Sequence, residues 1–554
     1  MILVPRSFLS GAPDRLRHAS KLWTFYAVTV LLAYGFTMFN LILVGDDWSA
    51  LQENYMNDWM ISIGRWMDVI VWSLANDDNF AAPITLCVLS VVYLIFAVAC
   101  CFCLGTKRPG SYLIFACTLI CFPFNAEPFV FKDLHLNFAL AILLATISGL
   151  FIVRGHELLI SRQTLKAAAL GAGATTALIL SAATYQTLAL FAVALVLPRL
   201  VGILREPYEN SQLFRWTAIL LGFSSIIFGV GYLIYMESVW GASWLTGVPL
   251  NTRGSYAIVG SFVESWSELR RQVFGSLVLL RDLFFQGQHL FPLTAKLVFL
   301  VLTAALTVAM ASGFAKANYR DQARTTAVWD GIVRALILVS VVVLLFFTPL
   351  APGMLRKVSG YRYNNLVGVA VPYAMVFALL FDIVRDPRLR RGIAVLIISI
   401  IAVFIFEQNR ASITTFLLNR RDLAIANRML ERITANPAFA PFAAKGQASI
   451  VFYGEHLEDR ILPRPFSAER FTLGAIDSCG IFNCQIVRAA PAFRLISEGG
   501  MTYHIGIWPA IPENTSTEEK QHLEQDIKKA HPWPAPDAVI FGTEVIVIML
   551  QTGG

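Results

Sequence analysis

Long apolar runs separated by short polar segments dominate the first three quarters of the chain. Eleven of these runs predict helices that cross or enter a membrane, where a full span needs about 20 apolar residues. They fall at about 23–44, 83–104, 111–124, 138–153, 167–184, 187–201, 217–237, 291–312, 332–350, 365–384 and 392–407. The stretch 167–201 could instead form one re-entrant element. The pattern predicts a polytopic α-helical membrane domain over residues 23–407.

The pattern changes after residue 407. A polar, amphipathic helical stretch at about 412–435 is followed by alternating apolar runs, whose period of two is typical of strands. These runs are Ser449–Tyr453, Ile481–Val487 and Ala538–Leu550. We therefore expect a small α/β or α+β domain over 408–554. Cys479 and Cys484 lie within it and could form a disulfide in an oxidising compartment.

Composition supports the membrane assignment. The chain is 56% hydrophobic and 15% charged, whereas soluble proteins carry about 25% charged residues. Its mean hydropathy is +0.61. The net charge of +7 is modest, and in a membrane protein such an excess marks cytoplasmic loops rather than nucleic-acid binding. The first apolar run is too long for a cleavable signal and lacks a small-residue cleavage site, so we expect a retained span after a cytoplasmic segment 1–22.

Basic residues are distributed unevenly between the two sides. With the N-terminus inside, the inner segments hold 20 Lys and Arg residues and the outer loops hold nine. The positive-inside rule therefore places the N-terminus in the cytoplasm, and an odd number of spans places the C-terminal domain outside. The outer loops are then 45–82, 125–137, 238–290 and 351–364. Because these loops hold most of the polar and aromatic residues, we expect an outward-facing active site.

The first outer loop opens with two adjacent carboxylates, Asp46 and Asp47, followed by Trp48. A carboxylate there could act as a general base, taking the proton of an acceptor hydroxyl as that oxygen attacks a sugar's anomeric carbon. One base suffices when the leaving group is a lipid phosphate. Trp48 and Trp66 could offer flat apolar surfaces to sugar rings. The alternatives are that the acids cap a helix and that the tryptophans belong to the interfacial aromatic belt.

Two further polar sites interrupt apolar sequence. Arg65 could hold Asp46 or Asp47, bind a phosphate or contact the sugar, or it could form a local ion pair with Asp68 three residues on. Tyr185 and Gln186 interrupt an apolar run at the outer end of a span, where polar groups are often functional. We expect them to bind the sugar, and the alternative is hydrogen bonding between helices.

The second and fourth outer loops supply charged candidates. Glu127 is a second possible base, Lys132 could bind phosphate, and His135 could contact phosphate or sugar; the alternative is a solvated loop. The donor phosphate would bind a basic cluster made of Arg356, Lys357 and Arg362, which could alternatively contact anionic headgroups. The spacing of the acids and histidine fits no known metal-ligand pattern, so we expect neither a metal nor another cofactor.

Four short motifs in order along the chain resemble one family. They are Asp-Asp-Trp at 46–48, Gly-Arg-Trp at 64–66, Glu-Pro-Phe at 127–129 and Tyr-Gln at 185–186. Together they resemble the serotype-converting O-antigen glucosyltransferases of the Gtr type, within the GT-C superfamily of integral membrane glycosyltransferases. The similarity covers roughly residues 23–407, and the C-terminal domain resembles no family that we can name.

The resemblance implies an activity and a location. The donor would be glucose on polyprenyl (undecaprenyl) phosphate, and the acceptor would be a sugar of the lipopolysaccharide O-antigen. Transfer would invert the anomeric configuration on the periplasmic face of the bacterial inner membrane. The catalytic aspartate in the first outer loop would correspond to Asp46 or Asp47.

Two other classes compete with this interpretation. A transporter or flippase for a lipid-linked sugar would favour paired repeats and broken helices with polar groups near the bilayer midplane. Here the acids gather in the outer loops instead. An O-antigen ligase or polymerase would share the outward, arginine-containing loops, and the early Asp-Asp-Trp motif is the main feature that favours a transferase.

Overall fold

The computed structural model describes most of the chain. The described residues are 12–40, 42, 55–74, 82–130, 134–205, 210–251, 266–285, 293–318, 324–350, 367–454, 492–493, 496, 501–512 and 515–550. The chain divides into two compact units, one formed mainly by Asn57–Asn409 and the other mainly by Arg410–Gly554. Each unit is described separately.

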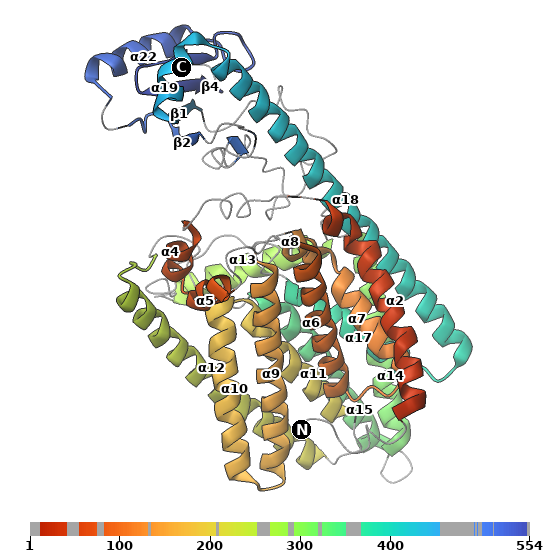
Figure 1. The fold of residues 1–554 in the computed structure, drawn as a ribbon. Helices are drawn as coiled ribbons and strands as arrows, with labels where there is room; N and C mark the ends of the chain where they lie inside the picture. Colours follow the sequence, from red (N-terminus) through yellow and green to blue (C-terminus); the bar gives the residue numbers. More distant parts are fainter. Residues whose placement is uncertain are drawn as a thin grey trace. The chain divides into compact units, whose positions relative to one another are not determined.

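The first unit is a bundle of apolar helices (Figure 1). In chain order they are α2 (Ala12–Phe39), α4 (Tyr55–Ser62), α5 (Trp66–Leu74), α6 (Ala82–Cys103), α7 (Pro109–Cys121), α8 (Ala126–Val130), α9 (His135–Ile160), α10 (Thr164–Thr184), η2 (Leu188–Phe191), α11 (Val193–Leu204), α12 (Asn210–Thr246), α13 (Trp266–Phe285), α14 (Leu293–Asn318), α15 (Arg324–Phe347), η4 (Thr348–Leu350), η6 (Val367–Val369), α17 (Ala370–Ile383) and the first part of α18 (Pro387–Thr434).

Helices lie at all eleven predicted apolar runs. Within the described residues, eight helices are long and apolar enough to cross a membrane, and α7 with α8, bent by 54°, adds a ninth if the pair is one span. The other two runs form shorter apolar helices, Leu188–Leu204 and Val367–Ile383. The bundle is therefore of the polytopic membrane type that the pattern predicts.

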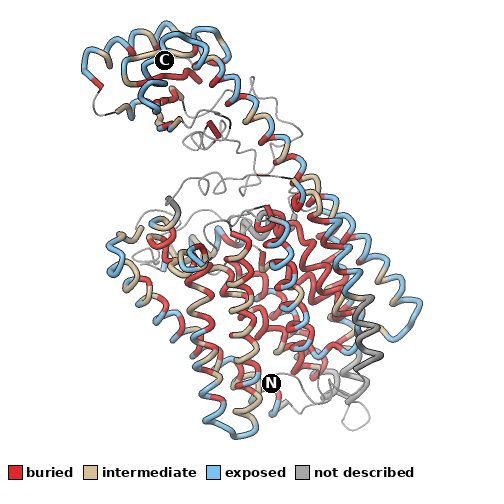
Figure 2. Tube along the Cα trace, viewed as in Figure 1, coloured by how far each residue is buried: buried red, intermediate tan, exposed pale blue. Residues whose placement is uncertain are grey.

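Helix α17 lies at the centre of the bundle. It is largely apolar, and all of its residues except Phe381 and Ile383 are buried, which is the pattern expected of an interior helix (Figure 2). It packs against α7 and α14. By contrast, only 22% of the apolar segment of α12 is buried, so most of that helix presents apolar side chains outward, as a lipid-facing helix does.

Close helix contacts depend locally on glycine. A Cβ atom at Gly202 of α11 would overlap the carbonyl oxygen of Cys103 at the end of α6. Only the absence of a side chain at this position lets α6 and α11 approach so closely.

The two ends of the bundle differ. Helices α4, α5 and α8, which belong to the predicted outer loops one and two, lie at one end, and the turn between α9 and α10 lies at the other (Figure 1). At this second end, Asp382 of α17 accepts hydrogen bonds from the Arg205 side chain and from the backbone amides of Lys107 and Arg108. Basic residues that the charge count places inside are thus tied into the packing of the bundle.

The second unit contains a four-stranded sheet of order β2-β1-β4-β3. Its strands are β1 (Gln447–Tyr453), β2 (Thr502–Ile507), β3 (Val539–Phe541) and β4 (Val545–Met549), with helices α19 (Ala440–Lys445) and α22 (Thr517–Lys529) alongside. Strand β1 pairs in parallel with β2 and β4, and β3 is antiparallel to β4. All five residues of β4 are buried. A small C-terminal domain with strands and helices is therefore present, as expected.

Three details of this unit differ from the expectation. The run 538–550 forms two strands, β3 and β4, with a turn in which Gly542 donates to the Val545 carbonyl. The helix expected at 412–435 is not separate, because the last apolar run continues into it as the 48-residue helix α18. Proline, which would end a helix, is absent between its first residue and Pro437. The run 481–487 and both Cys479 and Cys484 lie outside the described residues.

Candidate functional site

Arg65 lies at a sharp corner between two short helices, α4 and α5. Gly64 ends α4 in the left-handed conformation, with φ of 81°. The amides of Gly64 and Arg65 donate to the carbonyls of Ile61 and Met60, at 2.9 and 2.8 Å. This is the Schellman pattern, which requires glycine or a similarly permissive residue at that position. Because α5 begins directly at Trp66, the Gly-Arg-Trp motif is a compact turn with a fixed backbone.

A second break in the helical sequence lies against this corner. Helix α10 ends at Thr184, and Tyr185 then adopts an extended conformation, with φ of −153° and ψ of 105°. The Nε of Arg65 donates to Oε1 of Gln186 at 3.0 Å, and its guanidinium carbon lies 3.8 Å from the centre of the Tyr185 ring. Arg65 and the Tyr185–Gln186 pair were predicted as two separate polar sites. They form one site, although Arg65 and Gln186 are 121 residues apart in the sequence.

Helix α12 completes the contact through Tyr235. The side-chain amide of Gln186 donates to the Ile63 carbonyl at 2.8 Å and to the Tyr235 hydroxyl at 3.0 Å. That hydroxyl donates in turn to the Gly64 carbonyl at 3.1 Å. Gln186 thus bonds to Arg65 with its oxygen and to the corner backbone with its nitrogen, which fixes the orientation of its amide group.

Trp66 is held by the same helix. Its indole N–H donates to the Ser238 hydroxyl at 3.1 Å, and Ser238 donates to the Tyr235 carbonyl at 2.7 Å. We refer to these residues together as the Arg65 cluster: Arg65, Trp66, Tyr185, Gln186, Tyr235 and Ser238. The motifs predicted the first four members. Tyr235 and Ser238 were missed because they lie in and just beyond an apolar run, where a single hydroxyl gives no signal.

The cluster has the chemical groups of a site for a polar ligand. Arg65 is half-buried and stacked on an aromatic ring, and a guanidinium in this setting binds carboxylate or phosphate through its planar fork. The half-buried Trp66 adds an aromatic surface beside it. Neighbouring planar and charged groups of this kind suit a sugar phosphate or a sugar ring.

Asp68 does not form the local ion pair with Arg65 that was one interpretation of the sequence. The Arg65 side chain bonds to Gln186 instead, and Asp68 is fully buried in α5, with neither carboxylate oxygen hydrogen-bonded to any described residue. Burial raises the pKa of Asp68 well above its usual value, and the nearby Arg65 charge only partly opposes this shift.

His135 lies apart from the Arg65 cluster, at the start of α9. It is fully buried, with Nε2 3.1 Å from the Phe129 carbonyl and Nδ1 3.0 Å from the Thr85 hydroxyl. A carbonyl only accepts, so Nε2 carries the proton in the Phe129 bond. Both ring nitrogens are used inside the bundle, so these contacts give no support to a sugar contact by His135, which stays a prediction.

The described part of loop two is packed rather than solvated. Asn125 is buried and accepts from the Tyr93 hydroxyl at 3.1 Å, and Phe129 stacks on Tyr34 with ring centres 4.0 Å apart. The backbone of the Glu-Pro-Phe motif is thus anchored in the bundle as part of α8. Only the Glu127 side chain within that helix lies outside the description.

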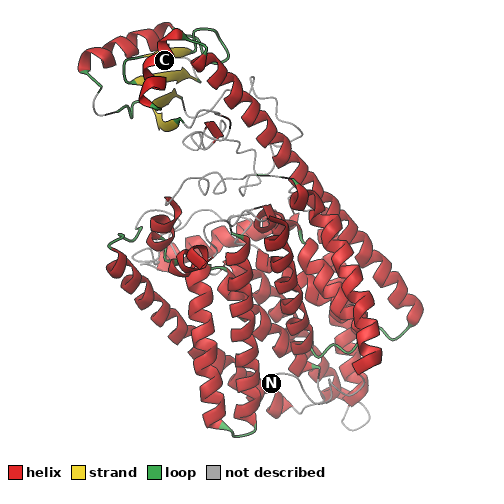
Figure 3. Cartoon of the chain, viewed as in Figure 1, coloured by secondary structure: helices red, strands yellow, loops and turns green. Residues whose placement is uncertain are grey.

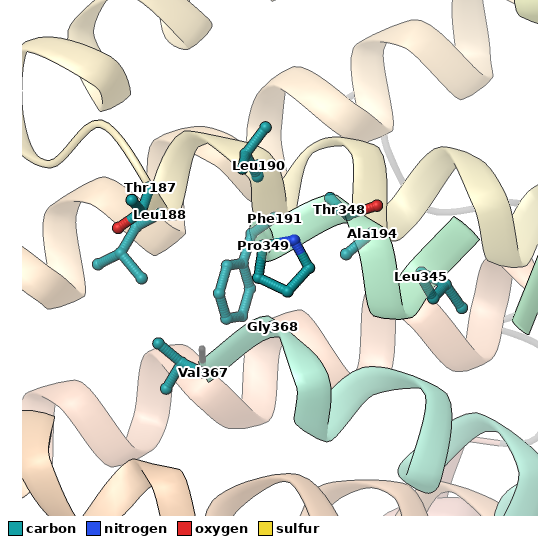
Figure 4. Close-up of a pocket in the computed structure, with 10 residues that line it drawn as sticks. All are labelled: Thr187, Leu188, Leu190, Phe191, Ala194, Leu345, Thr348, Pro349, Val367 and Gly368. Carbon is teal, nitrogen blue, oxygen red and sulfur yellow. The ribbon is translucent and has the colours of Figure 1, made fainter. Parts of the chain in front are cut away.

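An apolar cavity is lined in part by residues that directly follow the Arg65 cluster in the sequence. Thr187 and Leu188, which directly follow Gln186, line it, together with Leu190, Phe191, Ala194, Leu345, Thr348, Pro349, Val367 and Gly368 (Figure 4). The last four of these residues flank segment 351–366, which carries the predicted basic cluster. The mainly apolar side chains that line the cavity suit an apolar group rather than a charged one.

Several predicted site residues fall outside the description. They are Asp46, Asp47, Trp48, Lys132, Arg356, Lys357 and Arg362, together with the Glu127 side chain. Their roles stay predictions. Among the residues that the structure describes, no three His, Cys, Asp or Glu side chains are grouped so as to hold a metal ion. The expectation that no metal is required also stays a prediction.

An apolar helical bundle of this kind, with an arginine–aromatic–amide cluster at one end, is the fold of an integral membrane protein. The comparison with protein families makes the class specific. Residues 35–383 match the family described as Glucosyl transferase GtrII, and the chain belongs to this family. No curated protein matches the chain, and no solved structure matches it.

The family match confirms the resemblance seen in the short motifs. It covers every predicted catalytic, phosphate-binding and sugar-binding residue, and it also covers Asp68, Tyr235 and Ser238. The protein is therefore a membrane glucosyltransferase by family, which favours an enzyme over a transporter. Residues after 383, including the C-terminal sheet domain, lie beyond the match.

Proposed function

We propose that this protein transfers a hexose, glucose in the first instance, from a polyprenyl phosphate to a sugar of the lipopolysaccharide O-antigen. The observation that carries the proposal is the Arg65 cluster, in which family-matched segments far apart in sequence meet at one end of the bundle. In the sequence, Asp46 and Asp47 come shortly before α4 and α5, the helices that carry and flank Arg65.

The length of α12 supports a site at the lipid–water boundary. Its apolar segment has 35 residues, Gln212–Thr246, or about 53 Å at 1.5 Å per residue, against a hydrocarbon thickness of about 30 Å. Trp240 and Trp244, one to three turns beyond Tyr235, are 52% and 83% exposed, as is typical of residues at headgroup level. Tyr235 and the Arg65 cluster then lie near that level, where a lipid phosphate is found.

The charge count supports the periplasmic face. The cluster belongs to the end of the bundle opposite Arg205 and Asp382, where the predicted cytoplasmic basic residues gather. The N-terminus is then cytoplasmic, and the C-terminal domain is periplasmic. A polyprenyl-phosphate sugar in the outer leaflet of the inner membrane would reach the cluster directly.

The proposed reaction assigns a role to each group of predicted site residues. An acceptor hydroxyl oxygen attacks C1 of the donor hexose, Asp46 or Asp47 takes the hydroxyl proton, and the C1–O bond to phosphate breaks with inversion. The phosphate leaves with the bonding electrons as a stable anion, so it needs little acid assistance. Lys132, Arg356, Lys357 and Arg362 would stabilise its charge. Arg65, Trp66, Tyr185 and Gln186 would orient the sugar.

The test uses the full-length protein in proteoliposomes with radiolabelled glucosyl polyprenyl phosphate and O-antigen acceptor. We expect Asp46→Asn or Asp47→Asn to abolish transfer, with Asp46 the first choice because it is nearer the span. Asp58→Asn, an exposed acid of the same loop, is the matched control and should transfer normally. Near-normal transfer by both of the first two variants would show that neither acid is the base.

A further inference from the structure

Among the residues that the structure describes, two buried polar groups on α5 have no hydrogen-bond partner. The carboxylate oxygens of Asp68 and the indole N–H of Trp72 have no hydrogen-bond partner among the described residues. Asp68 is 0% exposed and Trp72 is 7% exposed. Buried polar groups in native proteins are nearly always hydrogen-bonded, so two such groups on one nine-residue helix need an explanation.

The two groups belong to the same face of the helix. Residues four apart are neighbours on an α-helix, with Cβ atoms about 5–6 Å apart. The helix packs against α10 and α9, and its first residues Trp66 and Met67 pack against a small core cluster that contains Ala183, near the end of α10. The flanking residues Met67, Val69 and Val71 are half-buried, so this face lies just below the surface rather than in the middle of the bundle.

A hydroxyl group is complementary to this pair. It can donate to the Asp68 carboxylate while it accepts from the Trp72 indole, and no other single uncharged atom of a sugar does both. It suits Asp68 in either protonation state, since it can accept from a carboxylic acid. Water and a sugar hydroxyl share this chemistry. The Arg65 cluster, which begins three residues before Asp68, favours the sugar.

We propose that Asp68 and Trp72 bind a hydroxyl group of the transferred hexose, next to the Arg65 cluster. The proposal rests on the proposed glucosyl transfer and names a contact within it. When the substrate is bound, this hydroxyl forms hydrogen bonds with the Asp68 carboxylate and the Trp72 indole N–H, which have no other hydrogen-bond partner among the described residues. The pair therefore selects for the position of one hydroxyl on the donor sugar ring.

The experiment combines variants with donors that lack single hydroxyls. Wild-type protein, Asp68→Asn and Trp72→Phe are reconstituted at full length, and kcat/KM is measured with glucosyl, 2-deoxy-, 3-deoxy-, 4-deoxy- and 6-deoxyglucosyl polyprenyl phosphate. Trp72→Phe removes the N–H and keeps an aromatic ring, and Trp240→Phe is its exposed control. A hydrogen bond to a charged group corresponds to about a 10- to 100-fold change.

We expect one deoxy donor to react about tenfold or more slowly with the wild type, and this penalty to shrink to about twofold or less in Asp68→Asn and in Trp72→Phe. Penalties of equal size in wild type and variants would mean that the pair binds water only or is structural, and would overturn the proposal. Wild-type rates within about twofold for all donors would overturn it without any variant. A wild type that transfers no hexose at all would instead refute the proposed function itself.

Discussion

Replacing Arg65 by lysine tests whether the geometry of the Arg65 cluster matters beyond its charge. Lysine keeps the positive charge but loses the Nε–H that donates to Gln186 at 3.0 Å and the planar group stacked 3.8 Å from Tyr185. A charge-assisted hydrogen bond contributes about 1.5–3 kcal/mol, and a cation–π contact at an exposed site about 0.5–1 kcal/mol. Because Arg65 is half-buried, we take the low end of both ranges, about 2 kcal/mol.

That free energy corresponds to about a 30-fold lower kcat/KM if it is expressed in the transition state. The assay is transfer in proteoliposomes, with Arg270→Lys on the exposed face of α13 as the matched control. The double variant with Gln186→Leu should lose less than the product of the two single losses, because the hydrogen bond that the two residues share is removed only once. Transfer by Arg65→Lys within threefold of wild type, or losses that simply multiply in the double variant, would refute the reasoning.

Three further outcomes follow from the same contacts. Tyr235→Phe should destabilise the protein by about 1–3 kcal/mol, because the buried Gly64 carbonyl loses its donor; an unchanged melting temperature would count against the described contact. Asp68→Asn should raise the melting temperature at neutral pH. Burial raises the pKa of Asp68 in the folded protein above its usual value of 3.8, so the wild type loses stability as the pH rises from 3.8 towards the folded-state pKa. Melting curves at pH 4.5 and pH 8 should therefore show a larger gain for the variant at the higher pH. Gly202→Ala should cost about 1–3 kcal/mol, because its Cβ would meet the Cys103 carbonyl, whereas the open position Gly222 should accept alanine at little cost.

The sequence predicted the helices well because membrane spans have a strong signal. Every apolar run falls on a helix, since a long run without charges has few other stable structures in lipid. What the runs do not encode is how far a helix continues into water. Helix α18 extends well past its predicted end because its polar continuation lacks proline and is rich in good helix formers such as Arg, Leu and Ala. Helix α12 also continues beyond its predicted end, through a segment without proline that reaches Thr246.

The site was predictable residue by residue but not as an arrangement. Arg65 and Gln186 each stood out as polar residues interrupting apolar sequence, yet only the fold shows that they bond to each other. A local ion pair between Arg65 and Asp68 was one alternative that the spacing of three residues suggested. The corner at Gly64 directs the arginine towards α10 instead, and Asp68 is left buried. Arg65 precedes the first residue of α5, so its side chain need not follow the i, i+3 geometry that holds within a helix.

The C-terminal domain was harder to predict in detail. Strand β2 and helix α22 gave no clear alternation or apolar stripe, because only Tyr503 in the strand and Leu523 and Ile527 in the helix are buried. Strand β2 is defined by a tertiary contact, its pairing with β1. Helix α22 begins after the N-cap Ser516, whose side chain accepts from the Glu519 amide, a local signal that the apolar pattern does not include. Strand β4 is fully buried and therefore had the strongest signal.

The most direct test of hexose transfer to the O-antigen is mass spectrometry of the lipopolysaccharide glycan from cells with and without this protein. Cells that produce the wild type should show a gain of one hexose per modified repeat. The gain should be lost in Asp46→Asn or Asp47→Asn and kept in Asp58→Asn, with all variants present in the membrane in equal amounts. An unchanged glycan in wild-type cells, or a gain that persists in both of the first two variants, would contradict this mechanism.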